Sequence, residues 1–321
     1  MNRRSLRNTA GWLAASMVRC TGAIERAHRS AMQSDCTLAL YFHNPSADHF
    51  SRIIRWFQER GYRFLSLGEL ESCFKTKTPC PKGSVWISLD DAWRGNLTEV
   101  IPIIREWNLP ITIFVPTREV LRGTFWFSHV VNNTDVLPPP FRRDVQQLWL
   151  VPESTRRRVI EHLFEICPPS QREVISVAEI ADLAKLPQVT IGSHSVNHAF
   201  MPNCNDDELR KEISDSRRDL EQWTGRPVRV FSYPNGDFDK RTARVLAEAG
   251  YSLAFTTEEH PITLADNPYY LPRFSIMDDG SLTENICHAL GLWVPLIRTV
   301  KSFALKPNLD AARSTGSCLP Q

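Results

Sequence analysis

Two adjacent carboxylates end the short stretch VWISLDD. Asp90 and Asp91 follow five mostly apolar residues that predict a buried strand. Like charges at the mouth of an apolar strand repel, so one carboxyl group would take a raised pKa unless a cation offsets the charge. A bound divalent metal would remove this conflict. Taken alone, the pair could equally be structural, with Asp91 capping the next helix and Asp90 paired to an arginine.

Two histidines in the stretch GSHSVNH strengthen the metal hypothesis. His194 and His198 are separated by three residues, a spacing that on a helical turn places both imidazoles on one face, within reach of one ion. Such pairs more often bind no metal, but this one follows a predicted strand. With Asp91 they would form a site of three ligands with open positions, as in catalytic zinc sites. Asp90 would then remain free as a general base.

The elements that must position these residues are short apolar runs that alternate with amphipathic segments of helical period. Helices are expected between the strands, for example over 96–108 and 206–223. This alternation predicts an α/β fold, a closed or partly closed (β/α) barrel of about seven parallel strands. In such barrels the loops at the carboxyl ends of the strands carry the catalytic groups. The strands are expected over residues 36–43, 62–67, 84–89, 111–115, 188–193, 228–233, 251–257 and 269–276.

The chain divides into three parts. Residues 1–35 have a basic start and a short apolar run that Arg19 ends, so we expect a helical or loosely ordered segment and favour this over a signal peptide. The barrel would span 36–305, with a helical insertion at about 117–186 where strand alternation stops. The polar residues 306–321 predict a flexible tail. No window is long and apolar enough for a transmembrane segment.

Composition limits the classes of partner. The 321 residues are 42% hydrophobic and 23% charged, with a net charge of +2, which is typical of a globular protein and gives no basic stripe for nucleic acid. The eight cysteines are scattered without a C-x-x-C motif, so we expect ordinary thiols and a reducing compartment. A cytoplasmic location, or one peripheral to the inner membrane, is favoured over export by an atypical signal sequence. Oligomeric state cannot be predicted.

Three motifs resemble those of the polysaccharide deacetylase family (the NodB homology domain, carbohydrate esterase family 4). SLDD resembles the family's first motif, [ST]-F-D-D, HSVNH matches H-[ST]-x-x-H, and FSYPNGDFD is similar to the third motif. The resemblance covers residues 38–276, interrupted by the insertion. It implies a distorted (β/α) barrel and the metal-dependent removal of an N- or O-acyl group, usually acetyl, from a carbohydrate.

The resemblance also implies roles for individual residues. Asp90 would be the general base toward a water activated by the metal. Asp91, His194 and His198 would hold a divalent metal, for which zinc fits the ligand set. The backbone N–H of Asn235 would help to stabilise the oxyanion. The partner would be an acylated carbohydrate or glycan precursor.

The chain departs from the family pattern in two places. The third motif usually carries an arginine two residues before its proline, and here that position is Ser232. Arg273 is the candidate that would orient the base instead, the alternative being a surface arginine. The family's Leu-x-His, which supplies the general acid, is absent. His43 at the end of the first strand is a candidate acid, with His260 and His288 as alternatives that the sequence does not separate.

Three aromatic residues could contribute to substrate binding. Trp93, Trp126 and Phe127 could stack on a sugar ring, although ordinary packing explains them equally well. The leading hypothesis is therefore a hydrolase of carbon–nitrogen bonds in a glycan. A small-molecule amide hydrolase with the same site, or a catalytically degenerate glycan-binding protein, are the alternatives.

Overall fold

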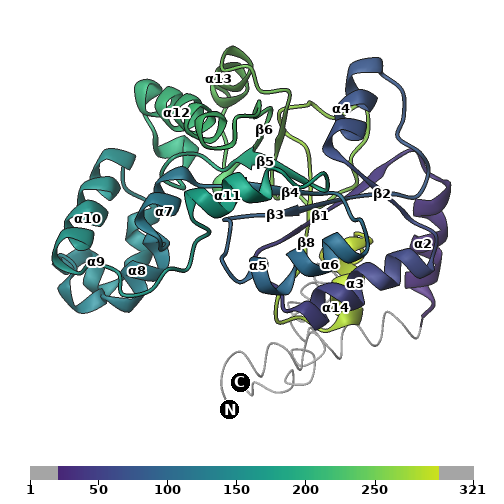
Figure 1. Cartoon of the computed structure of the whole chain (residues 1–321), viewed down its shortest axis with the longest axis horizontal. Helices are drawn as coiled ribbons and strands as arrows, with labels where there is room; N and C mark the ends of the chain where they lie inside the picture. Colours follow the sequence, from purple (N-terminus) through teal and green to yellow (C-terminus); the bar gives the residue numbers. More distant parts are fainter. Residues whose placement is uncertain (1–20, 296–321) are drawn as a thin grey trace, which may run out of the picture.

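The computed structural model describes residues 21–295, and its centre is one curled sheet of parallel strands with helices packed around it (Figure 1). The strand order is β7-β6-β5-β4-β3-β1-β8, and β2 pairs with the first half of β3. The predicted (β/α) barrel of about seven parallel strands is confirmed. The strands are β1 (Thr37–Phe42), β2 (Arg63–Leu65), β3 (Ser84–Leu89), β4 (Ile111–Val115), β5 (Val189–Ser193), β6 (Val230–Ser232), β7 (Leu253–Phe255) and β8 (Phe274–Ser275).

The helices follow from capping residues and amphipathic periodicity. In α3, the apolar residues Phe50, Ile53, Ile54 and Phe57 recur at helical spacing and are all buried. Capping boxes start α4, α11, α12 and α14. The helices around the sheet are α2 (Ala23–Gln33), α3 (Ala47–Glu59), α4 (Leu67–Thr76), α5 (Asn96–Glu99), α6 (Ile101–Glu106), α12 (Asp206–Thr224), α13 (Thr242–Glu248) and α14 (Leu282–Ala289).

The helix expected over 96–108 is two helices in the structure, α5 and α6. Pro102 lies in the first turn of α6. Proline has no N–H to donate to the preceding turn and its ring clashes with that turn, so a helix tolerates it only near its start. Pro102 therefore divides the single helix that the amphipathic period predicted into two.

Successive side chains along each strand point alternately toward the helices and toward the inside of the curled sheet. Leu38, Leu40 and Phe42 of β1 face the helices, whereas Trp86 of β3 and Phe255 of β7 belong to a second cluster inside the curl of the sheet. The two rings stack with centroids 4.3 Å apart. Toward the carboxyl ends of the strands the inward positions become polar. The apolar interior thus lies beneath the polar residues.

A group of helices lies between β4 and β5. It has a small core of its own, which includes Trp126, Leu148 and Ile160. In Figure 1 its helices α8, α9 and α10 lie together at one side of the sheet. We call this group the insertion; its helices are α7 (Thr117–Arg122), α8 (Trp126–Asn132), α9 (Pro139–Arg143), α10 (Glu153–Ile166) and α11 (Val177–Leu183).

The terminal predictions fall largely outside the part of the chain that the structure describes. This holds for residues 1–20 of the N-terminal segment and for the tail at 306–321. Across residues 21–295, no helix is both long and apolar enough to cross a membrane.

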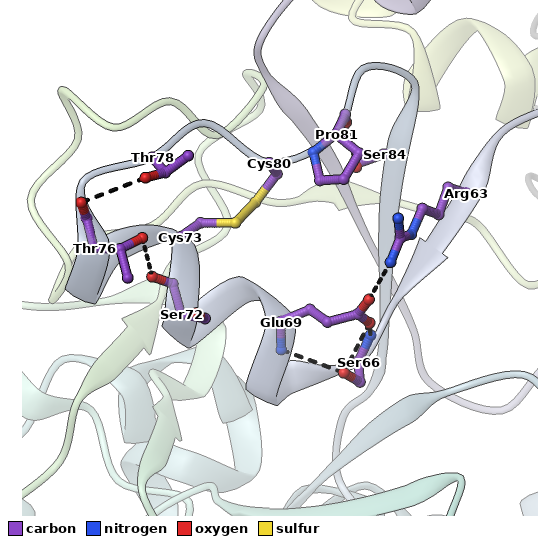
Figure 2. The surroundings of a disulfide bond; sticks show 10 residues. All are labelled: Arg63, Ser66, Glu69, Ser72, Cys73, Thr76, Thr78, Cys80, Pro81 and Ser84. Carbon is purple, nitrogen blue, oxygen red and sulfur yellow. Dashed lines mark hydrogen bonds and ion pairs between the residues drawn. A yellow bond between two sulfur atoms is a disulfide. The ribbon is translucent and has the colours of Figure 1, made fainter.

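The expectation of ordinary thiols is wrong for two cysteines. A disulfide joins Cys73 of α4 to Cys80 in the segment that leads into β3, with the two Cα atoms 5.7 Å apart (Figure 2). The chain reverses after α4 because Lys77 adopts a left-handed conformation (φ 54°). The N–H of Thr78 then donates to the carbonyl of Cys73 at 3.1 Å. This turn brings together two cysteines whose spacing matches no motif.

Peptide mapping should find this disulfide. Trypsin cleaves after Lys77 and so separates Cys73 from Cys80 in sequence. An unreduced digest is expected to contain the two peptides joined, and reduction should release both. Cys204, a free thiol in the structure, is the internal control and should be alkylated after unfolding without reductant. Alkylation of Cys73 and Cys80 in the unreduced protein would contradict the structure.

Candidate active site

A cavity of about 1010 Å³ opens at the carboxyl ends of the strands. Polar groups from several strands meet there, as expected for a parallel (β/α) arrangement. The insertion supplies one wall. The lining residues are Tyr41, His43, Asn44, Asp90, Asp91, Trp93, Trp126, Phe127, Ser128, Val131, Asn132, Trp149, Glu173, His194, His198, Asn235, Thr257 and Asp278.

Three buried side chains converge on one point of this cavity. The Nε2 atoms of His194 and His198 lie 3.4 Å and 3.2 Å from the Oδ1 atom of Asp91. The two histidines are not on a helical turn, as their spacing had suggested. They lie on the irregular segment that follows β5, in which Ser195 and His198 have left-handed backbone conformations. Asp91 also has a positive φ of 71° and caps no helix.

The chemistry of this trio fits a divalent cation. Nδ1 of His194 lies 2.7 Å from the carbonyl oxygen of Ser232. A carbonyl only accepts, so Nδ1 carries the proton and Nε2 turns its lone pair toward Asp91. Oδ1 of Asp91 has no hydrogen-bond partner among the described residues, although it is buried. A cation between these acceptors would satisfy all of them, and one carboxylate with two imidazoles is a ligand set typical of zinc.

Burial and neighbouring groups shift the pKa values of Asp91 and His198. Burial by itself would raise the pKa of Asp91, but when no metal is bound a proton on the Nε2 atom of His194 or His198 outweighs burial and holds that pKa well below its usual range. Burial lowers the pKa of His198 despite the adjacent carboxylate. The site is therefore set to present a carboxylate and a neutral imidazole, the forms that bind metals.

Arg273 holds Asp90, the second carboxylate of the pair. Its guanidinium is fully buried, which excludes the alternative of a surface arginine. It donates to Oδ1 and Oδ2 of Asp90 at 2.7 Å and 2.8 Å. Its other donors go to Ser88, Ser232 and the carbonyl of Thr256, so all five N–H groups are used. Burial would raise the pKa of Asp90, but the charge and hydrogen bonds of Arg273 hold it below its usual range.

Asn235 lies in a tight turn at the end of β6. The turn, Pro234–Gly236, places Asn235 in the left-handed region (φ 58°), which asparagine tolerates better than most residues. Gly236 follows with φ 80°, and a Cβ atom there would lie 2.8 Å from the backbone nitrogen of Thr257. Glycine is therefore required, and the turn presents Asn235 to the cavity.

A family model described as polysaccharide deacetylase matches residues 77–254, more than half of the chain. The chain belongs to the polysaccharide deacetylase family. The family expected from the motifs is thus confirmed, and with it a hydrolase of the polysaccharide deacetylase type.

Individual relatives agree with this family. A curated protein from Staphylococcus aureus (strain MSSA476), poly-beta-1,6-N-acetyl-D-glucosamine N-deacetylase, is 24% identical over 73% of this chain and 68% of its own length. The Streptococcus pyogenes deacetylase PplD in complex with acetate is 17% identical, with a TM-score of 0.59 over 79% of this chain and 98% of that one. IcaB from Ammonifex degensii is 17% identical, with a TM-score of 0.58, and the match covers 80% of this chain and 98% of IcaB. At these identities the solved structures establish the shared fold.

The structure accounts for the missing arginine of the third deacetylase motif. Ser232, which occupies that position, accepts a hydrogen bond from Arg273 at 2.7 Å and donates to Asp90 at 3.3 Å. The small serine side chain leaves room for a guanidinium that arrives from just before β8. Asp90 therefore still has an arginine partner, but this arginine, Arg273, comes from the residue before β8 instead of from the third motif.

Removing Arg273 is expected to destabilise this deacetylase fold. Arg273→Met would leave Asp90 buried without a cation, and breaking a buried pair in this way costs about 3–5 kcal/mol of unfolding free energy. Urea unfolding at neutral pH measures the change. Adding Asp90→Asn removes the unpaired charge and should recover part of the loss. Arg218→Met, at a guanidinium that is 66% exposed, is the matched control and should cost less than about 1 kcal/mol. A double variant no more stable than Arg273→Met would contradict the assignment.

The three candidate acids lie in different places. His43 lines the cavity. His260 is exposed and its nearest polar contact is the carbonyl of Pro261. His288 is buried in α14 beside Glu259, at 3.4 Å, and does not line the cavity. Only His43 among them therefore shares the cavity with Asp90.

The aromatic wall is only partly the one expected. Trp93 and Phe127 are half-buried and line the cavity; Trp126 also lines it but is almost fully buried and packs edge-on against Phe127. Sequence reasoning missed Trp149 of the insertion, because nothing in the local pattern shows where the insertion folds. It also missed Asp278, whose carboxylate accepts from the N–H of Asn44 at 3.1 Å. Its position shortly after the last strand is the signal that could have found it.

Proposed function

We propose that the protein is a metal-dependent hydrolase that removes an N-acetyl group from a carbohydrate. One observation carries the proposal. The buried group of Asp91, His194 and His198 lies beside the Asp90–Arg273 pair at the floor of an open cavity. A divalent ion held by the first three residues supplies Lewis-acid chemistry toward the acyl carbonyl and the attacking water.

Residues of the chain would carry the proton transfers. Asp90 accepts the proton of the attacking water on a carboxylate oxygen, with Arg273 fixing the direction of that oxygen. The backbone N–H of Asn235 donates to the acyl oxygen as negative charge develops there. His43 gives a proton to the nitrogen as the carbon–nitrogen bond breaks. The products are acetate and the free amine of the sugar.

Cavity size and relatives point to the substrate class. The cavity of about 1010 Å³ has aromatic walls at Trp93, Phe127 and Trp149 and has room for more than a small amide. The curated relatives from Staphylococcus aureus are named poly-beta-1,6-N-acetyl-D-glucosamine N-deacetylase. An oligomer of N-acetylglucosamine is therefore the first substrate to test.

Acetate release tests the function. The zinc-loaded protein is expected to release acetate from N-acetylglucosamine oligomers and much less from small amides such as acetanilide. The reverse preference would indicate a small-molecule amide hydrolase. Stoichiometric metal binding without acetate release from any acetylated glycan would indicate a degenerate binding protein and would overturn the proposal.

The compartment is a separate proposal. Disulfides persist mainly in oxidising compartments. The Cys73–Cys80 bond therefore supports export, which the sequence made less favoured than a cytoplasmic location or one peripheral to the inner membrane. Fractionation of cells that express the full chain would test it.

A further inference from the structure

The segment that carries both histidines has no regular secondary structure. It leaves β5 after Ser193 and has left-handed backbone conformations at Ser195 (φ 65°) and His198 (φ 46°). Residues in this region cost of order 1–3 kcal/mol each and persist only where surrounding groups fix them. We call residues 194–198 the ligand loop, and two neighbouring parts of the fold hold it in this conformation.

Helix α12 holds the ligand loop from one side. Oε2 of the buried Glu212 accepts hydrogen bonds from the N–H groups of Val196 and Asn197 at 3.0 Å and 2.8 Å. Oε1 of Glu212 accepts from the side-chain amide of Asn197 at 2.6 Å. One carboxylate thus fixes the N–H groups in the middle of the loop.

The insertion holds the loop from the other side through Arg156 of α10. Its guanidinium donates to the carbonyls of Asn197 at 3.2 Å and His198 at 3.3 Å. The side chain is only 1% exposed, and its charge is balanced by a paired contact with Glu153 at 2.8 Å from both Nε and Nη2. Water therefore has little access to replace these donors.

The same guanidinium also contacts the cavity wall. Its carbon lies 4.6 Å from the ring centre of Trp126, a lining residue, and 5.2 Å from that of Phe200. Such cation–π contacts fix the plane of the guanidinium as well as its position. Arg156 thus contacts both Trp126 in the cavity wall and the backbone of His198, a proposed metal ligand.

We infer that Arg156 is a positioning residue of the proposed metal centre, through which the insertion sets the direction of the His198 side chain. The inference rests on the proposed function. A fixed carbonyl at His198 limits rotation of its backbone and so fixes the direction of the Cα–Cβ bond that carries the imidazole. Groups hydrogen-bonded to a ligating side chain commonly change metal affinity by about 10–100-fold, and this range sets the scale for Arg156, which acts through the ligand's backbone. The insertion then has two tasks, shaping the cavity and holding a ligand.

Zinc affinity tests the inference separately from stability. The main variant combines Arg156→Met with Glu153→Gln, so that no unpaired charge stays buried. Arg156→Lys keeps the ion pair with Glu153, but one ammonium group cannot serve Glu153 and both carbonyls. Arg158→Met, an exposed position on the same helix, is the matched control. Zinc dissociation constants are measured by competition with a chelator, and the unfolding midpoint of each metal-free protein is measured alongside.

The double variant is expected to bind zinc about 10–100-fold more weakly than the wild type, and Arg156→Lys about tenfold more weakly, with the control within about twofold. A folded double variant within about twofold of the wild type would overturn the inference. If the double variant does not fold, the inference is tested on Arg156→Lys, and a zinc affinity within about twofold of the wild type would overturn it. If neither folds, Arg156 supports the fold alone and the inference fails. A wild type that binds no divalent metal would instead count against the proposed function.

Discussion

Replacing Asp90 by asparagine is expected to lower the rate of acetate release by about 10²–10⁴-fold, because a general base is lost while its shape is kept. The amide oxygen of asparagine can accept from one N–H of Arg273, but its NH2 group cannot accept from the second, and the buried guanidinium loses its counter-charge. The variant should therefore be less stable than the wild type, so its rate is measured on protein shown to be folded. Zinc affinity should change little, since the metal ligands are other residues. Acetate release and zinc content of the purified variant are the two measurements.

The control for Asp90→Asn is the same change at an exposed site. Asp182, on α11, is 73% exposed and pairs with Lys185, so Asp182→Asn should leave the rate unchanged. Full activity of Asp90→Asn would remove Asp90 from the mechanism. A loss of zinc together with activity would instead place Asp90 among the ligands, contrary to the geometry in which Asp91 faces both histidines.

Replacing His194 by alanine is expected to weaken zinc binding by at least about 100-fold and to abolish measurable acetate release. A site with three protein ligands that loses one rarely keeps a catalytic metal, because metal affinity depends on the complete ligand set. Zinc should also stop raising the thermal midpoint, since a ligand stabilises only the state that binds it. Chelator competition and thermal unfolding with and without zinc measure both effects.

His162 provides the matched histidine control. It lies on α10 with its side chain 65% exposed, and it pairs with Glu165. His162→Ala should bind zinc and release acetate like the wild type. Stoichiometric zinc in His194→Ala with an unchanged affinity would show that the buried trio is not the metal site.

Local pattern predicted the strands and the residues at their ends well. Apolar runs of strand length gave β3 and β4 with the same bounds as in the structure. The carboxyl ends of parallel strands lie at one edge of a sheet, so Asp90, Asp91 and His194 could be expected together from their positions alone. The H-x-x-x-H spacing also brought His198 to the same point, although by an irregular loop instead of a helical turn.

Other contacts depend on segments that are distant in sequence. Arg273 and Asp90 are 183 positions apart, and their pairing depends on how the sheet curls. Arg156 reaches His198 only because the insertion folds back on the ligand loop. The Cys73–Cys80 bond depends on one left-handed residue that reverses the chain. The departure from the third motif made Arg273 a candidate partner of Asp90 but left a surface arginine as the alternative, and neither hydrophobic period nor motif spacing indicated the other two contacts.

The sequence by itself determined the parallel (β/α) class, the deacetylase motifs and the residues offered to a metal, because strand period and strand-end position are local properties. The tertiary structure alone decided that Arg273 takes the place left by Ser232 beside Asp90, and that His43 is the candidate acid that lies in the cavity. It also decided that the insertion contacts the ligand loop. Each of these depends on the curvature of the sheet and on side chains that meet only after folding.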